Sequence, residues 1–273
     1  MLLAWYQHLP LDINPIAFSI GFFSVRWYGL MYLVGFAVVY RLLKFRMVKG
    51  EFPVSTPNLV TDYLLVAFFS ALIGGRLGYV LFYNAQYYLA NPLAIISLYD
   101  FQSGKYVGIF GMSYHGALLG IIFGSYLFLK KKKINFLEWA DFVIPAAALG
   151  YFFGRIGNFL NGELYGRITG SPLGMYFGAD YEHLRHPSQL YEAFLEGMLL
   201  FVILWNLRNM KFKKGTLFGI YLMGYGLVRI FAEQFRQPDP QVGFLWNHLT
   251  MGQFLSFAMT LGGAFLLVSK KGK

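Results

Sequence analysis

Seven apolar stretches, each long enough to cross about 30 Å of hydrocarbon as a helix, recur along the chain. Polar and mostly basic segments separate them. They occupy residues 27–43, 60–82, 112–129, 136–156, 188–207, 216–235 and 249–268. The pattern predicts an all-α integral membrane protein with seven transmembrane helices, built as a single polytopic domain over residues 1–273.

Basic residues are concentrated after alternate stretches and set the predicted orientation. Fifteen of the 23 Lys and Arg residues fall within residues 41–49, 130–133, 208–214 and 270–273. Because cytoplasmic loops of membrane proteins carry the excess of Lys and Arg, we expect the N-terminus outside the membrane and the C-terminus in the cytoplasm. The same placement explains the net charge of +10 without nucleic acid as a partner.

Composition narrows the class of protein further. The 273 residues are 57% hydrophobic and only 13% charged, about half the charged fraction of an ordinary soluble protein. This excludes a soluble domain and a disordered chain. The chain has no cysteine, which excludes disulfides and a cysteine nucleophile of its own. The first residues lack the pattern of a cleavable signal peptide.

Two connecting segments are expected on the extracytoplasmic side. Residues 84–111 are aromatic with few charges, which is typical of a segment lying along the membrane interface. Residues 157–187 form a longer connection than helices usually need, and long ordered loops often carry function.

Arginines outside the basic clusters indicate an anion-binding site in the outer half of the protein. Eight basic residues lie outside the clusters, and seven of them are Arg. A planar guanidinium matches phosphate and carboxylate oxygens. An Arg within a membrane span normally faces a polar cavity or a partner, and the candidates are Arg76, Arg155 and Arg229. The alternative is that each extends from near a helix end to the outer interface.

Residues 154–167, GRIGNFLNGELYGR, are the most informative segment. They combine four glycines with two arginines, two asparagines and Glu163. If the helix continues through Arg155, then Asn158 follows one turn later and both can address one ligand. The structural alternative is a polar turn with glycines for helix packing.

Three further groups carry candidate chemistry. Arg229, Glu233 and Arg236 have the spacing i, i+4, i+7, which predicts that they share one helical face; a surface ion-pair ladder is the alternative. His115, in SYHGALLG, is either a hydrogen-bonded structural residue or a proton acceptor near neutral pH. Tyr28, in RWYGLMY, also fits an ordinary interfacial aromatic belt.

The segment HPSQLYEA, residues 186–193, begins the fifth apolar stretch. Gln189 and Glu192 of this segment, with Glu196 just after it, place polar groups on the entering helix, for a functional purpose or for helix capping. The sequence contains no HExxH, GxSxG or phosphate-binding GxxxxGK[ST] motif, so we expect neither a metal nor a cofactor.

The five motifs together resemble the bacterial phosphatidylglycerol:prolipoprotein diacylglyceryl transferase family along nearly the whole chain. GRIGNFLNGELYGR is similar to the family's signature, and RWYGLMY, SYHGALLG, HPSQLYEA and RIFAEQFRQPD occur in the family's order. The resemblance implies an enzyme of the bacterial cytoplasmic (inner) membrane with its active site toward the outside. It would transfer the sn-1,2-diacylglyceryl group of phosphatidylglycerol to the lipobox cysteine thiol of a prolipoprotein signal peptide, releasing glycerol phosphate.

The resemblance also implies which residues matter. The implied catalytic residues are Tyr28, His115, Arg155 and Arg229. The implied substrate-binding residues are Asn158, Glu163 and Gly166, with Glu233 and Arg236 in support, and we add Gln189 as a candidate from its place on the helix of the fifth apolar stretch. Which residue acts as the base stays open.

Reaction chemistry agrees with these assignments. Breaking a carbon–oxygen bond at glycerol turns a phosphodiester into a phosphate monoester with more negative charge, and arginines from separate helices could stabilise that charge as it grows. Residue patterns alone leave two alternatives open: a transporter or channel for an anionic solute or lipid, and a non-enzymatic receptor or assembly factor.

Overall fold

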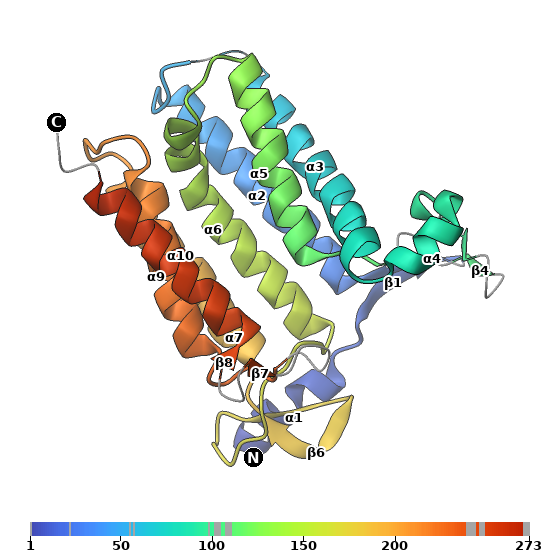
Figure 1. The fold of residues 1–273 in the computed structure, drawn as a ribbon. Helices are drawn as coiled ribbons and strands as arrows, with labels where there is room; N and C mark the ends of the chain where they lie inside the picture. The colour runs from blue at the N-terminus through green and yellow to red at the C-terminus, as the bar shows by residue number, and fades with distance from the viewer. Residues whose placement is uncertain are drawn as a thin grey trace. The chain divides into compact units, whose positions relative to one another are not determined.

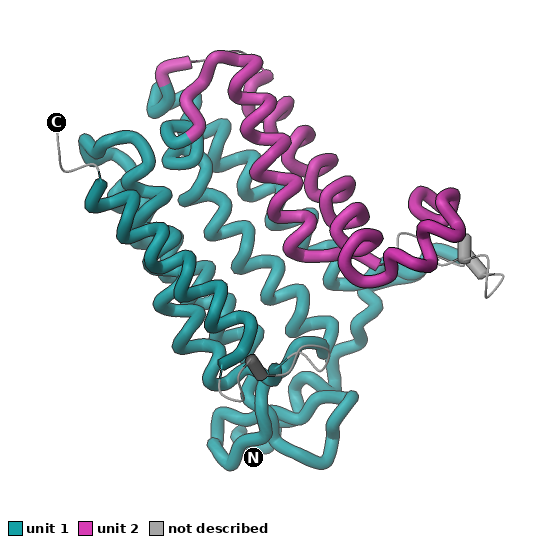
Figure 2. The backbone as a smooth tube through the Cα atoms, viewed as in Figure 1, with its two compact units in different colours: residues 1–52, 137–273 teal, residues 53–136 magenta. Residues whose placement is uncertain are grey.

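The computed structural model describes residues 2–21, 23–54, 56, 58–97, 99–100, 105–106, 111–238, 244–245 and 249–269. The chain divides into two compact units, Met1–Phe52 with Leu137–Lys273, and Pro53–Phe136 (Figure 2). Two parts of the predictions lie outside the described residues: the lysines of residues 270–273, and residues 98, 101–104 and 107–110 of the interfacial segment.

Helices occupy the predicted apolar stretches (Figure 1). In chain order they are α2 (Trp27–Val48), α3 (Leu59–Phe82), α5 (Tyr114–Lys131), α6 (Phe136–Leu160), α7 (Ser188–Glu192) continuing through η2 (Ala193–Leu199) into α8 (Leu200–Leu207), α9 (Thr216–Ala232) and α10 (Met251–Val268). Among the described residues, five helices are long and apolar enough to span a membrane: Trp27–Val48, Leu59–Phe82, Phe136–Leu160, Ser188–Leu207 and Met251–Val268. The predicted class, a helical membrane protein, is therefore confirmed.

The outer faces of these helices are apolar, as expected where lipid is the solvent. Phe265 in α10 is 70% exposed and Phe123 in α5 is 64% exposed. Contiguous apolar surface of this kind is unfavourable in water. In a bilayer the same side chains lie against acyl chains.

The unit Pro53–Phe136 is built on close packing of α3 against α5 (Figure 1). A Cβ on Gly74 would overlap the carbonyl oxygen of Gly116, so the two backbones touch where both residues lack side chains. After α3 come α4 (Ala85–Ala90), the 3₁₀ helix η1 (Pro92–Ile95), and the short strands β3 (Tyr99–Asp100) and β4 (Lys105–Tyr106), which pair antiparallel.

Arg76 serves this unit rather than an anion site. Its Nε donates to the carbonyl oxygen of Ile95 and its Nη2 to that of Ala94, each at 2.7 Å. Its guanidinium also lies over the ring of Tyr88, 5.1 Å from the centroid. The partly buried cation therefore ties η1 to α3.

In the unit of Met1–Phe52 with Leu137–Lys273, the sequence did not predict a set of small elements outside the long apolar helices. It comprises α1 (Leu2–Asp12) and three antiparallel strand pairs: β1 (Ile16–Ile20) with β2 (Phe23–Arg26), β5 (Met175–Phe177) with β6 (Asp180–Arg185), and β7 (Phe244–Leu245) with β8 (Leu249–Thr250). Met175 and Phe177 point inward and bury against Phe159 at the end of α6. Residues 157–187 are therefore an ordered connection that covers the end of α6.

The end of α6 sets the position of the site. Gly162 has φ +68° and donates its N–H to Phe159 O, while Glu163 N–H reaches back to Asn158 O. This pair of bonds is a Schellman motif, in which a glycine adopts the left-handed conformation that ends the helix. The helix continues to Leu160, beyond the predicted boundary at residue 156, so Arg155 and Asn158 are both helical.

The prediction that Arg229, Glu233 and Arg236 share one helical face is wrong for Arg236. Helix α9 ends at Ala232. The chain then turns, and Arg236 pairs with Gly166 in an isolated antiparallel bridge. Arg167 N–H donates to Phe235 O at 2.8 Å in the same joint. The segment after α9 is thereby fixed to the connection after α6.

Candidate functional site: a buried arginine–glutamate cluster

The centre of the candidate site is the carboxylate of Glu192 in α7, whose side chain is buried. Arg229 Nη1 lies 2.7 Å and Arg155 Nη2 2.9 Å from its Oε2. Arg236 Nη1 lies 3.6 Å from its Oε1. Three guanidinium groups, from α6, from α9 and from the turn after α9, therefore converge on one carboxylate.

Arg155 is held by three different side chains. Besides Glu192, its Nε donates to Tyr151 Oη at 2.7 Å, and its Nη1 donates to Asn158 Oδ1 at 3.4 Å. Tyr151 in turn donates to Glu196 Oε2 at 2.5 Å. The rigid fork of donors suits such divergent partners, whereas a lysine ammonium cannot reproduce it.

Arg229 links a second set of carboxylates. Its Nη1 lies 3.4 Å from Glu196 Oε1, and its Nη2 lies 2.9 Å from Glu233 Oε2. Glu233 also accepts a hydrogen bond from Thr250 Oγ1 at 3.0 Å, at the start of α10. The cluster, defined as Arg155, Arg229, Arg236, Glu192, Glu196 and Glu233, has three positive and three negative groups when all are ionised.

Burial makes this arrangement energetically demanding. Glu192 and Glu196 are fully buried, and removing one partner of a buried ion pair typically costs about 3–5 kcal/mol because the other charge is left unpaired. The side chains of Arg155, Arg229 and Arg236 are 16%, 10% and 11% exposed, so the cluster is not completely sealed from its surroundings.

The connection after α6 adds a second polar group next to the cluster. Asn158 Nδ2 donates to Glu163 Oε1 at 2.9 Å. Gln189 Nε2 donates to the carbonyl oxygen of Glu163 at 2.6 Å, and Gln189 is fully buried. Asn158 and Glu163 thus join the predicted arginines through Arg155, and Gln189 fixes the backbone beside them.

Gly166 lies where only glycine fits. A Cβ there would overlap the carbonyl oxygen of Phe235 and would lie 2.9 Å from the carbonyl oxygen of His186. The N–H of Gly166 donates to His186 O at 2.8 Å. The glycine therefore permits the joint that brings Arg236 to the cluster.

The remaining predicted site residues are Tyr28 and His115. Tyr28, near the start of α2, donates its hydroxyl to Tyr32 Oη at 3.2 Å, and its backbone lies against Gly157 of α6. His115, in α5 of the unit Pro53–Phe136, is exposed. The roles of both residues stay predictions.

Sequence reasoning did not assign Tyr151, Glu192 or Glu196 to the site. The alternative of helix capping is not observed for α7, whose N-cap Pro187 has no side-chain cap bond. A signal for the two glutamates was present, because two carboxylates four residues apart within an apolar stretch require cationic partners. Tyr151 carries no such signal, since tyrosine is common in apolar stretches.

Fold and cluster together define a helical membrane protein in which buried arginines and glutamates from different helices meet at the ends of α6, α7 and α9. The family model described as prolipoprotein diacylglyceryl transferase matches residues 15–269. The chain belongs to this family.

Curated relatives agree over almost the full length. The chain is similar to proteins named phosphatidylglycerol–prolipoprotein diacylglyceryl transferase from two bacteria, Chlorobaculum tepidum and Desulfotalea psychrophila. With the first it shares 48% identity over 270 residues, covering 98% of this chain and 93% of the relative. With the second it shares 45% identity over 267 residues, covering 96% and 94%. A relative of the same name from Rickettsia bellii is 43% identical over 261 residues, covering 94% and 95%.

Proposed function

We propose that this protein transfers the sn-1,2-diacylglyceryl group of phosphatidylglycerol to the lipobox cysteine thiol of prolipoproteins, forming a thioether and releasing glycerol phosphate. The family and the names of the curated relatives support this activity. The structural observation that carries the proposal is the convergence of Arg155, Arg229 and Arg236 on Glu192.

The proposed chemistry is a substitution at a glycerol carbon. The thiolate sulfur of the acceptor forms a bond to the carbon that carries the phosphate ester, and the carbon–oxygen bond breaks. The oxygen and its electron pair leave with the phosphate, while the thiol proton passes to a base. The leaving group changes from a phosphodiester with one negative charge to a monoester approaching two.

Stabilisation of this growing charge is the role we assign to Arg155 and Arg229. Because the positive and negative groups of the cluster balance, the net charge of the cluster attracts the lipid phosphate only weakly. The carboxylates instead hold the guanidinium donors in fixed directions before the substrate binds. Donors fixed in advance stabilise the transition state more than the ground state, which is the condition for catalysis.

The neighbouring polar groups would bind the headgroup and position the arginines. Asn158 and Glu163 offer amide and carboxylate groups suited to the glycerol hydroxyls of phosphatidylglycerol. Glu233 and Arg236 complete the ion pairs around Arg229 and Glu192, and Gln189 and Gly166 hold the backbone of the connection. We assign His115 as the candidate proton acceptor and Tyr28 as a further catalytic residue.

The proposed setting is the bacterial inner membrane, with a single domain of seven spans and the site toward the outside. The basic clusters after alternate spans support an external N-terminus and a cytoplasmic C-terminus. Both substrates are anchored in this membrane, so neither has to leave it for the reaction. We propose no metal or cofactor.

The direct test is to incubate the purified protein in detergent with phosphatidylglycerol and a synthetic lipobox peptide. We expect the peptide to gain the mass of one diacylglyceryl group and an equal amount of glycerol phosphate to appear. A peptide with serine in place of the cysteine is the control and should remain unmodified. If the protein binds phosphatidylglycerol but neither product forms, the enzyme assignment is wrong and a binding or transport function is favoured.

A further inference from the structure

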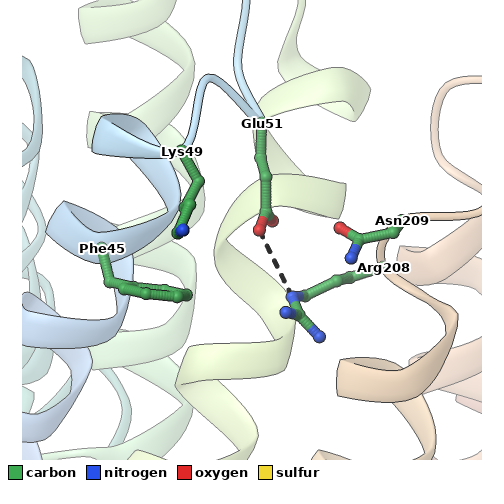
Figure 3. Close-up of a pocket in the computed structure, with 5 residues that line it drawn as sticks. All are labelled: Phe45, Lys49, Glu51, Arg208 and Asn209. Atoms are coloured by element: carbon green, nitrogen blue, oxygen red, sulfur yellow. Dashed lines mark ion pairs between the residues drawn. The ribbon is translucent and has the colours of Figure 1, made fainter.

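A pocket of about 350 Å³ lies at the other end of the helices, where α2 and α8 finish. It is lined by Phe45, Lys49, Glu51, Arg208 and Asn209. Figure 3 shows Lys49 and Arg208 on either side of Glu51, with Arg208 Nε 3.4 Å from Glu51 Oε1. All five residues belong to the unit of Met1–Phe52 with Leu137–Lys273.

The charge of the pocket is not balanced by its own residues. Glu51 already has a partner, because the buried Arg46 places its Nε 2.6 Å from Glu51 Oε2 and also donates to the carbonyl oxygen of Phe142. The pocket lining itself carries Lys49 and Arg208 against the single carboxylate of Glu51, which leaves one positive charge in excess. Outside the lining, Arg46 also interacts electrostatically with Asp141. An anion is the complementary ligand.

Arg208 has binding capacity that its protein contacts do not use. Its guanidinium lies over the ring of Trp205, 3.9 Å from the centroid, and its Nη1 donates to the carbonyl oxygen of Trp205. Its buried Nε is directed at Glu51 Oε1, 3.4 Å away. A guanidinium carries five N–H groups, so N–H groups of the terminal nitrogens remain to bind a phosphate oxygen.

The preference of helix ends for cations explains only part of this arrangement. Lysine or arginine near the C-terminal end of a helix interacts favourably with the helix dipole, which accounts for basic residues at the ends of α2 and α8. It does not account for the hollow between them.

One exposed apolar side chain lines the pocket, and two more are next to lining residues in the sequence. Val48 is 87% exposed beside Lys49, and Met210 is 56% exposed beside Asn209. Phe45 forms one wall of the pocket, is 45% exposed and stacks on Trp205. Basic groups next to exposed apolar ones match a phospholipid, whose charged headgroup adjoins its acyl chains.

We propose that this pocket binds the phosphate-bearing headgroup of an anionic phospholipid in the membrane leaflet bordering this end of α2 and α8. Arg208 and Lys49 bind the phosphate oxygens. Asn209, which also lines the pocket, binds headgroup hydroxyls, and the acyl chains lie along Phe45 and Val48. The site is separate from the arginine–glutamate cluster and does not depend on the proposed reaction.

Native mass spectrometry of the full-length protein in detergent tests the proposal, with phosphatidylglycerol and phosphatidylethanolamine of matched chains as probes. The pocket variant is Lys49→Gln with Arg208→Gln, in which Glu51 keeps its partner Arg46. The matched control is Lys211→Gln with Lys214→Gln, which removes two exposed cations outside the pocket lining. Lys49→Gln alone, at an exposed position, is the second variant if the double variant fails to fold.

We expect wild type and control to retain one more phosphatidylglycerol than the pocket variant, and no additional phosphatidylethanolamine. Affinity for that lipid should fall about tenfold in the pocket variant, the loss expected when a charge-assisted hydrogen bond disappears. Equal retention by pocket variant and control would overturn the proposal. Release of the extra lipid by excess inorganic phosphate would overturn the assignment to a lipid and indicate a site for free phosphate.

Discussion

Glu192 is the residue on which the site's geometry depends most. Its carboxylate lies within 2.9 Å of guanidinium nitrogens from both Arg155 and Arg229. Without it, two buried cations would lose their common partner and repel each other at close range. We therefore regard Glu192 as a positioning residue that aims the two arginines at the departing phosphate.

Substitution of Glu192 by glutamine should affect both stability and activity. Glutamine keeps the shape but not the charge, so we expect a loss of about 3–5 kcal/mol of stability, the range for breaking a buried ion pair, and at least a tenfold lower transfer rate. Thermal unfolding in detergent and the peptide assay measure the two effects. Glu182→Gln, at an exposed position of β6, is the control and should change neither.

A wild-type transfer rate in a folded Glu192→Gln protein would contradict the positioning role. Partial recovery in Glu192→Asp would support it, because aspartate restores the charge on a shorter side chain. A purely structural role predicts instead that activity follows the folded fraction.

At the level of single residues, the sequence predicted the arginines together with Glu233 and Asn158, but not Glu192 and Glu196. Arg155 and Arg229 were recognisable because arginine is rare and costly in apolar stretches. The identity of the partner depends on which helices are neighbours. That is a property of tertiary packing, and motif spacing within α7 does not contain it.

At the scale of elements, the site depends on the joint between the connection after α6 and the turn after α9. Gly166 and Arg236 pair there, and Arg167 Nε also donates to the carbonyl oxygen of Arg236 at 2.9 Å. The joint explains how Arg236 reaches Glu192 although α9 has already ended at Ala232.

Gly166→Ala tests this joint. Since a Cβ would overlap Phe235 O, the two segments must separate, and we expect lower thermal stability together with a loss of most transfer activity. The matched control is Gly178→Ala, where an added Cβ meets nothing within 4 Å. If both alanine variants behave alike in unfolding and transfer assays, the joint does not matter for the site.

The β5–β6 hairpin should depend on pH through Asp180. Hydrogen bonds from His183 and Arg185 lower the pKa of the Asp180 carboxyl below its ordinary value. These hydrogen bonds therefore stabilise the folded hairpin fully above the ordinary Asp pKa of about 3.9. Their stabilisation is lost as the pH falls through the lowered pKa of Asp180 in the folded state.

Hydrogen–deuterium exchange of the hairpin, corrected for intrinsic rates, measures this contribution. At neutral pH we expect faster exchange in Asp180→Asn than in wild type, and a smaller difference once the wild-type carboxyl is protonated in acid. Equal protection in both proteins at neutral pH would show that these bonds contribute nothing to the hairpin.

The helices were predictable because the length of an apolar stretch decides that a helix forms there. The residues at which the helices end were less predictable. Each apolar stretch became helical, yet α6 extends to Leu160 because a Schellman motif, rather than the apolar pattern, terminates it. The π-helical turns over Ala193–Leu199 and the short strand pairs gave no periodic signal. Such features follow from local hydrogen bonding and from packing against other parts of the chain.

At the scale of the whole molecule, the central proposal is orientation, with the cluster outside and the phospholipid pocket toward the cytoplasm. The absence of cysteine provides a clean background for testing it. In Glu182→Cys the thiol should react with a membrane-impermeant reagent in intact cells, whereas in Lys213→Cys it should react only after permeabilisation. The reverse pattern would invert the proposed orientation, and reaction of both in intact cells would indicate a different number of spans.

In the proposed mechanism, Arg155 and Arg229 stabilise the charge that develops on the departing phosphate. The most direct test of this role is to measure kcat and KM for phosphatidylglycerol in Arg155→Lys and Arg229→Lys, with the exposed Arg41→Lys as control. We predict that kcat falls about 100-fold or more, the usual effect of removing a donor that acts in the transition state, while KM changes little. A higher KM with unchanged kcat would mean that the arginines only bind the lipid, and would contradict the account.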